Sequence, residues 1–228
     1  MICKMVASDL RCVVPTLNRL DHYLCSFFGR RMVFEFAVSA LQLNPEAIQL
    51  RHNLKTPFMS AQSTNIIEPL DLGGFLLEKS IEKGITNLKL NKLIYLAHGY
   101  YWGNFELPLI NNGELAKAWK HRPVYRSVYN FFGAFKSDDI PLAYSAISTN
   151  YNSFDEQTSD FLNHLWDTFK NAPPWYLVEM LHEKDSPWYI VWHRKGGKYT
   201  QGSPIHDHLT RAYYLSKVKE LSSGDGKR

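Results

Sequence analysis

The residues best suited to metal binding or nucleophilic chemistry are three cysteines and nine histidines, and their spacing argues against both kinds of site. Cys3, Cys12 and Cys25 lie at irregular intervals that match neither paired zinc ligands nor a disulfide framework. His206 and His208 are two residues apart, whereas two metal ligands on one helix need a spacing of about three or four. We therefore expect no metal, no cofactor and no catalytic cysteine.

Other catalytic patterns are equally weak. The stretch Lys195-Gly196-Gly197-Lys198 contains glycines and cations but lacks the strand, helix and Lys-Ser/Thr ending of a phosphate-binding loop, so it predicts a surface turn. The acidic pair Asp138-Asp139 and the acidic residues of 155–160 suit helix N-termini, where the helix dipole favours negative charge. The sequence predicts a protein that is not an enzyme.

Aromatic residues next to cations are the most informative pattern, since 14% of the chain is aromatic. The candidate partner-binding residues, which combine large rings or cations with nearby prolines, are Trp119, Arg122, Tyr125, Arg126 and Trp188. Tryptophan, tyrosine and arginine are typical of protein interfaces. Two alternatives remain open: the rings pack the core, or they form a platform for stacked RNA bases.

The charge distribution favours a protein partner over nucleic acid. Residues 1–58 carry seven basic and four acidic side chains, whereas residues 59–228 carry 19 and 18. A phosphate backbone needs clustered cations, and a nearly neutral region does not supply them. No apolar run is long enough to cross a membrane, and Lys4, Asp9 and Arg11 interrupt any signal peptide. We therefore expect a cytoplasmic protein that binds neither membrane nor nucleic acid.

Hydrophobic periodicity predicts a mainly α fold, a compact helical domain with a minor β element. Residues 1–58 lack regular periodicity and are either an unstructured extension or upstream sequence read from a misassigned start. The domain is expected over 59–221, followed by a disordered tail at 222–228. Within the domain, the predicted helices cover 70–81, 88–101, 124–135, 154–169, 175–182 and 205–221.

Local signals add four expectations about individual elements. Ser153 and Glu156 have the spacing of a capping box at the start of a helix. Trp188 to Trp192 is aromatic and β-branched, which makes it the best strand candidate. Ser203-Pro204 is expected to begin the last helix, and Glu114 to Trp119 is expected to be a short helical or extended piece.

Three motifs in order resemble the SocA-like Panacea antitoxin domain family. The run from Asn87 to Tyr100 is similar to the leading helix of the family. The second motif comprises Pro108-Leu109, Glu114, Ala116 to Trp119 and Arg122-Pro123-Val124, with His121-Arg122 where a glycine before the proline is common. The third comprises Leu181-His182 and Ser186-Pro187-Trp188, with Leu181 in place of the usual threonine, and a closing helix begins at Ile205.

The resemblance covers roughly Leu70 to Leu215 and implies a non-enzymatic antitoxin of a bacterial or prophage toxin–antitoxin pair. Such a protein neutralises a cognate toxin by direct binding and, in one member type, delivers the toxin to a AAA+ protease. The residues expected to form the core of the family motif are Leu90, Leu93, Tyr95, Trp102, Pro123 and Pro187. The alternative is a DNA-binding autoregulator or phage-associated regulatory protein that uses Arg30, Arg31 and the basic tail.

Overall fold

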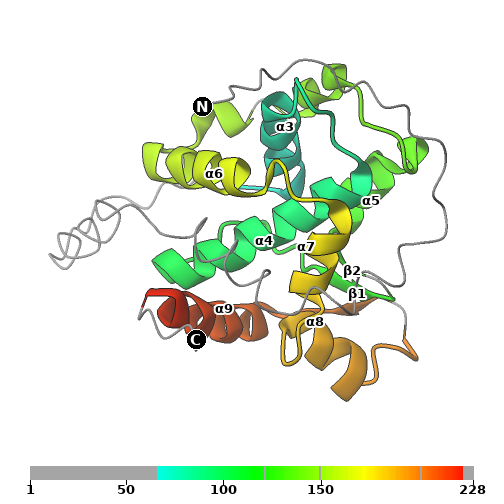
Figure 1. Ribbon diagram of the computed structural model, residues 1–228, viewed down its shortest axis with the longest axis vertical. Helices are drawn as coiled ribbons and strands as arrows, with labels where there is room; N and C mark the ends of the chain where they lie inside the picture. Colours follow the sequence, from blue (N-terminus) through cyan, green and yellow to red (C-terminus); the bar gives the residue numbers. More distant parts are fainter. Residues whose placement is uncertain (1–65, 121, 149, 201, 223–228) are drawn as a thin grey trace, which may run out of the picture. The chain divides into compact units, whose positions relative to one another are not determined.

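The computed structural model of the chain describes residues 66–120, 122–148, 150–200 and 202–222 (Figure 1). The expectations for the 1–58 extension, including its cysteines and Arg30-Arg31, lie outside these residues, as does most of the tail. Over the described ranges the chain is mainly helical with one small sheet, which confirms the predicted fold class.

Helix α4 (Asn87–Phe105) is the central element (Figure 1). The Thr86 side chain caps its first turn by accepting a hydrogen bond from the Lys89 backbone N–H at 3.3 Å. The helix confirms the one predicted over 88–101, and apolar residues on more than one of its faces are buried. The longer helices packed against it are α3 (Pro69–Lys79), α6 (Glu156–Phe169), α7 (Pro174–Leu181) and α9 (Asp207–Ser222).

Two glycines of α4 allow α9 to approach closely (Figure 1). A Cβ atom added at Gly99 would overlap the ring of Tyr214. A Cβ atom added at Gly103 would lie 2.6 Å from the carbonyl oxygen of Tyr214 and 2.6 Å from Val218 Cγ2. The close contact between these two helices therefore depends on residues without side chains.

The sheet has three short antiparallel strands in the order β2-β1-β3, namely β1 (Lys117–Trp119), β2 (Arg122–Val124) and β3 (Ser203–Pro204). Trp119 pairs with Arg122 across the β1–β2 hairpin. Pro123 and Pro204 lie on the two outer strands, where proline is tolerated because one side of the strand needs no hydrogen-bond donor. The segment ending at Trp119 is thus extended rather than helical.

Short elements complete the described chain. Where the sequence predicted one helix over 124–135, the structure has helix α5 (Arg126–Phe131) followed by the 3₁₀ helix η2 (Gly133–Phe135). The other short elements are the 3₁₀ helices η3 (Leu142–Ile147) and η4 (Asn150–Ser153), the one-turn helix α8 (Pro187–Tyr189) and the π-helix η5 (Ile190–Arg194).

The strand predicted at Trp188 to Trp192 is wrong, because these residues form α8 and part of η5. Pro187 occupies the first turn, and the Ser186 hydroxyl accepts a hydrogen bond from the Tyr189 N–H at 3.1 Å. Both features start a helix. Local capping therefore outweighed the β propensity of the aromatic and branched residues, which depends strongly on context.

The predictions for two helix starts are also wrong. Ser203-Pro204 forms β3 and pairs with β1, so α9 begins only at Asp207. Helix α6 is capped by Asp155, whose carboxylate accepts a hydrogen bond from the Thr158 N–H at 2.6 Å, and Ser153 lies in η4. In this second case the carboxylate immediately before the helix takes the capping position.

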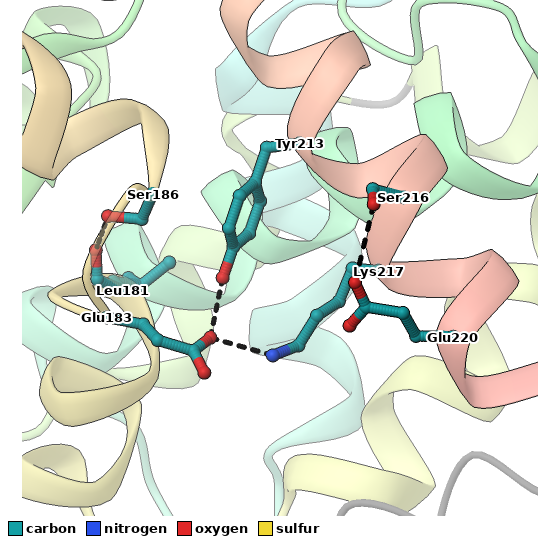
Figure 2. Close-up of polar contacts among 7 residues, drawn as sticks. All are labelled: Leu181, Glu183, Ser186, Tyr213, Ser216, Lys217 and Glu220. Atoms are coloured by element: carbon teal, nitrogen blue, oxygen red, sulfur yellow. Dashed lines mark hydrogen bonds and ion pairs between the residues drawn. The ribbon is translucent and has the colours of Figure 1, made fainter. Parts of the chain in front are cut away.

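A carboxylate joins the segment after α7 to α9 (Figure 2). Glu183 Oε2 accepts hydrogen bonds from the Tyr213 hydroxyl at 2.6 Å and from Lys217 Nζ at 2.7 Å. Burial alone would raise the pKa of Glu183, but the hydrogen bonds from Lys217 and Tyr213 outweigh it and lower the pKa. Among the described residues, no helix combines the length and apolar character required to cross a membrane.

Candidate partner-binding site

The β1–β2 hairpin and α5 bring together a ring pair and a cation. The rings of Trp119 and Tyr129 meet edge to face with their centroids 4.6 Å apart. The guanidinium carbon of Arg122 lies 5.3 Å from the centroid of the Tyr129 ring, within the range of a cation–π contact. All three side chains are half-buried, and Arg126 on the first turn of α5 is exposed. We call these four residues the hairpin surface.

Hydrogen bonds between core side chains and the backbone of residues 119–129 fix the hairpin surface to the core. Trp188 Nε1 donates to the carbonyl oxygen of Trp119 at 2.8 Å, and Asn87 Nδ2 donates to that of Tyr129 at 3.1 Å. The N–H of Tyr125 donates to Asn91 Oδ1 at 3.2 Å. These bonds position the surface on α4 and on the element that follows α7, so its geometry is set by rigid neighbours.

Two of the five predicted partner-binding residues belong to the core instead. Tyr125 is 1% exposed and Trp188 is 4% exposed, so neither ring is available to a partner. Trp188 stacks on His182 with a centroid distance of 3.8 Å. For these two rings the core-packing alternative is correct, because large aromatic side chains next to prolines also fill cores. Trp119, Arg122 and Arg126 stay in the hypothesis.

The residues expected to form the core of the family motif differ in burial. Leu90, Leu93, Tyr95, Pro123 and Pro187 are buried. Trp102 is only half-buried, and the guanidinium carbon of Arg211 on α9 lies 5.9 Å from the centroid of its ring.

Lys92 is a functional candidate that sequence reasoning missed. It is 0% exposed, and among the described residues its Nζ has no hydrogen-bond partner. Burial, and to a smaller extent the positive charge of Arg122, lowers the pKa of Lys92 to about 7. The sequence contained an indication of this burial. A lysine in the middle of a helix that is apolar on several faces is expected to have its side chain in the core.

His98 on α4 makes polar contacts with both of its ring nitrogens. His98 Nδ1 accepts a hydrogen bond from the Ile110 N–H at 3.1 Å, and its Nε2 lies 3.2 Å from Asp207 Oδ1. Because Nδ1 accepts, the ring proton lies on Nε2 and is directed at the carboxylate. Over the described ranges, no group of three or more His, Cys, Asp or Glu side chains is placed to hold a metal ion.

This arrangement defines a class: a mainly helical domain that presents a rigid aromatic and cationic surface. Residues 90–189 match the family described as "Antitoxin SocA-like, Panacea domain", which confirms the resemblance drawn from the sequence motifs. The matched range starts within α4 and ends with α8, so it includes the hairpin surface and Lys92. Helix α9, which the motif comparison included, lies outside it.

One relative supports the same family. The chain is 25% identical over 177 residues to Antitoxin SocA of Caulobacter vibrioides (strain NA1000 / CB15N). The alignment covers 72% of this chain and 92% of that relative. No solved structure matches the chain.

Proposed function

We propose that this chain is an antitoxin that neutralises a cognate toxin by binding it directly in the cytoplasm. The family match and the similarity to a protein named as an antitoxin support the antitoxin role. The observation that carries the binding mechanism is the hairpin surface, in which Trp119, Tyr129 and Arg122 are held together at the surface by the core. Residues of these types supply much of the binding energy in protein interfaces.

The proposed mechanism is occlusion, with no covalent bond made or broken. A partner that covers about 1,200–2,000 Å² in total would bury the hairpin surface and the residues around it. The backbone of the surface is already fixed by hydrogen bonds. The side chains of Trp188 and Asn87 donate to it, and the side chain of Asn91 accepts from it. Binding therefore needs little ordering of the antitoxin, which reduces its entropic cost.

A finer form of the proposal follows from the family resemblance. In that form the bound toxin, encoded beside this chain in a bacterium or prophage, is passed to a AAA+ protease. Occlusion alone predicts that the toxin accumulates in a complex, whereas delivery predicts that toxin levels fall when this chain is made.

Co-expression tests the proposal. Each small reading frame that flanks this gene is expressed alone and together with the full chain, and growth and toxin levels are followed. We expect one frame to arrest growth alone and to be harmless together with this chain, in a complex that survives purification. If no flanking product is toxic, or if its toxicity persists beside the folded chain, the proposed function is wrong.

A further inference from the structure

Arginines that lie over aromatic rings provide an internal comparison within the described part of the chain. The three pairs are Arg122 with Tyr129, Arg194 with Tyr189, and Arg211 with Trp102. Arg194 also forms an ion pair with Asp185, and Arg211 forms one with Glu106 at 3.1 Å. Among the described residues, Arg122 has no acidic partner. Arg194 and Arg211 therefore each contact both a ring and a carboxylate, whereas Arg122 contacts a ring and, among the described residues, no carboxylate.

Lys92 makes the lack of a carboxylate at Arg122 more unusual. This second cation is wholly buried on α4, the helix that contacts strand β2 and its Arg122, and its Nζ has no partner among the described residues. The charge of Arg122 contributes to the lowered pKa of Lys92. Burying an ammonium group without a partner is costly, and a neighbouring like charge adds to that cost. A nearby carboxylate would offset both penalties.

We propose that Arg122 binds an Asp or Glu side chain of the protein partner, and that the buried Lys92 supplies the second positive charge that makes this position selective for an acid. The proposal rests on the proposed function, because it names the chemistry of the toxin surface. Arg122 is half-buried and makes the contact itself. Lys92 does not touch the partner and acts only through its charge, as a positioning residue.

A carboxylate fits this position better than the phosphates of a nucleic acid. Residues 59–228 are nearly neutral, and nucleic-acid binding depends on many phosphate contacts rather than on two cations. The Trp119 and Tyr129 rings beside Arg122 provide apolar area, which a protein partner can bury around a single acidic side chain. The guanidinium group can hold a carboxylate through two parallel hydrogen bonds.

Acetate serves as the probe for the first test, in the full 228-residue chain. NMR of labelled arginine and lysine side chains follows Arg122 and Lys92 in acetate, phosphate and chloride at equal ionic strength. We expect acetate to shift the Arg122 Nε–Hε signal in a saturable way. Acetate should also raise the titration midpoint of Lys92 by about half a pH unit relative to chloride. Such a shift means that acetate favours the ionised amine about threefold.

Variants of the same chain separate the proposed roles. Arg122→Gln should abolish the response of Lys92 to acetate, and Lys92→Met should weaken acetate binding at Arg122 about threefold or more while leaving the Arg122 signal in place. Arg211→Gln is the matched control, because this arginine also lies over a ring but has its own Glu106. It should leave both responses unchanged. Equal effects of acetate and chloride, or an unchanged Lys92 response in Arg122→Gln, would overturn the proposal.

Two further outcomes separate the proposals from each other. If phosphate or duplex DNA shifts Arg122 more strongly than acetate does, the site binds phosphate and the acidic-partner proposal is wrong. Once co-expression has identified the toxin, its Asp and Glu residues are changed to Arg one at a time. One of these substitutions should abolish binding to the native chain and restore binding to the Arg122→Glu variant. Failure of every such charge swap overturns this inference but leaves the antitoxin role intact. Failure of co-expression with a normal acetate response overturns the antitoxin role instead.

Discussion

The contacts of α9 and the hairpin surface differ in how their charged side chains are paired. Along α9, Asp207 lies next to His98 at 3.2 Å, and Lys217 and Tyr213 both bind Glu183. At the hairpin surface Arg122 has no acidic partner among the described residues, and neither has the buried Lys92 on α4, the helix that contacts β2. The first region has the paired polar groups of a structural contact, whereas the second has the unbalanced charge expected of a surface that meets another molecule.

The difference implies that stability and function are separated in this domain. Changes in the α4–α9 contact should lower the free energy of unfolding, whereas changes at the hairpin surface should alter binding and leave that free energy unchanged or higher. The four predictions below test this separation, in order of decreasing effect on the free energy of unfolding.

The largest loss is expected for Gly99→Val. The added side chain would overlap the Tyr214 ring and force α9 away from α4, so the free energy of unfolding should fall by about 3 kcal/mol. Urea denaturation followed by circular dichroism measures it. Gly133→Ala is the control, because a Cβ atom there has nothing within 4 Å and should change stability by less than about 0.5 kcal/mol. Similar losses in both variants would contradict the proposed packing.

The second prediction concerns the pH dependence of stability caused by Lys92. Its folded-state pKa of about 7 is below the ordinary value of 10.5, so the unfolded chain binds more protons between these values. The contribution of Lys92 to stability is therefore complete above the unfolded pKa and is lost as the pH falls towards about 7. We expect Lys92→Met to be more stable than the native chain near pH 7, with an advantage that shrinks by up to about 1.4 kcal/mol per pH unit as the pH rises.

Denaturation of both proteins at several values between about pH 7 and pH 9.5 measures this effect. The upper limit avoids the tyrosines, because burial raises the pKa of Tyr95 and Tyr100 and their contribution to stability is lost only above their ordinary range. A constant difference between the two proteins would show that Lys92 is paired in solution.

A smaller loss is expected when the ion pair after α7 is removed (Figure 2). Glu183→Gln should lower the free energy of unfolding by about 1 kcal/mol, since the carboxylate is partly exposed and solvent weakens its bonds to Tyr213 and Lys217. A double-mutant cycle with Lys217→Met measures the coupling. Exact additivity of the two changes would mean that the contact contributes nothing.

The smallest change in stability is expected for Arg122→Glu, which should nevertheless abolish neutralisation of the toxin. Loss of the contact with Tyr129 costs about 0.5–1 kcal/mol, and a carboxylate beside Lys92 offsets this cost. Thermal unfolding measures stability and the co-expression assay measures neutralisation, with Arg211→Glu as the control that should still neutralise. A parallel loss of folding and neutralisation would show that Arg122 is structural.

Sequence reasoning was most accurate where a long periodic pattern left one interpretation. The helix at α4 was predicted because apolar residues recur at helical spacing over residues 88–101. The same reasoning failed at Trp188 to Trp192 and at Ser203-Pro204, which exchanged their expected types. Short segments depend on their neighbours: Ser186 and Pro187 start a helix at the first, and pairing with β1 makes the second a strand.

The candidate site shows the same division. The residue types of the hairpin surface were evident from the sequence, but Tyr125 and Trp188 could be assigned to the core only from their burial. Lys92 escaped notice because a lysine is normally exposed, and its isolation depends on residues distant in the chain.

By itself the sequence determined the helical class, the order of the family motifs and the supply of rings and cations between β1 and α5, because these depend on local periodicity and composition. Tertiary structure alone decided which rings face solvent, which carboxylate meets which cation, and that Arg122 and Lys92 meet none among the described residues. The physical reason is that burial and electrostatic pairing are properties of distances between residues remote in the chain, and folding sets those distances.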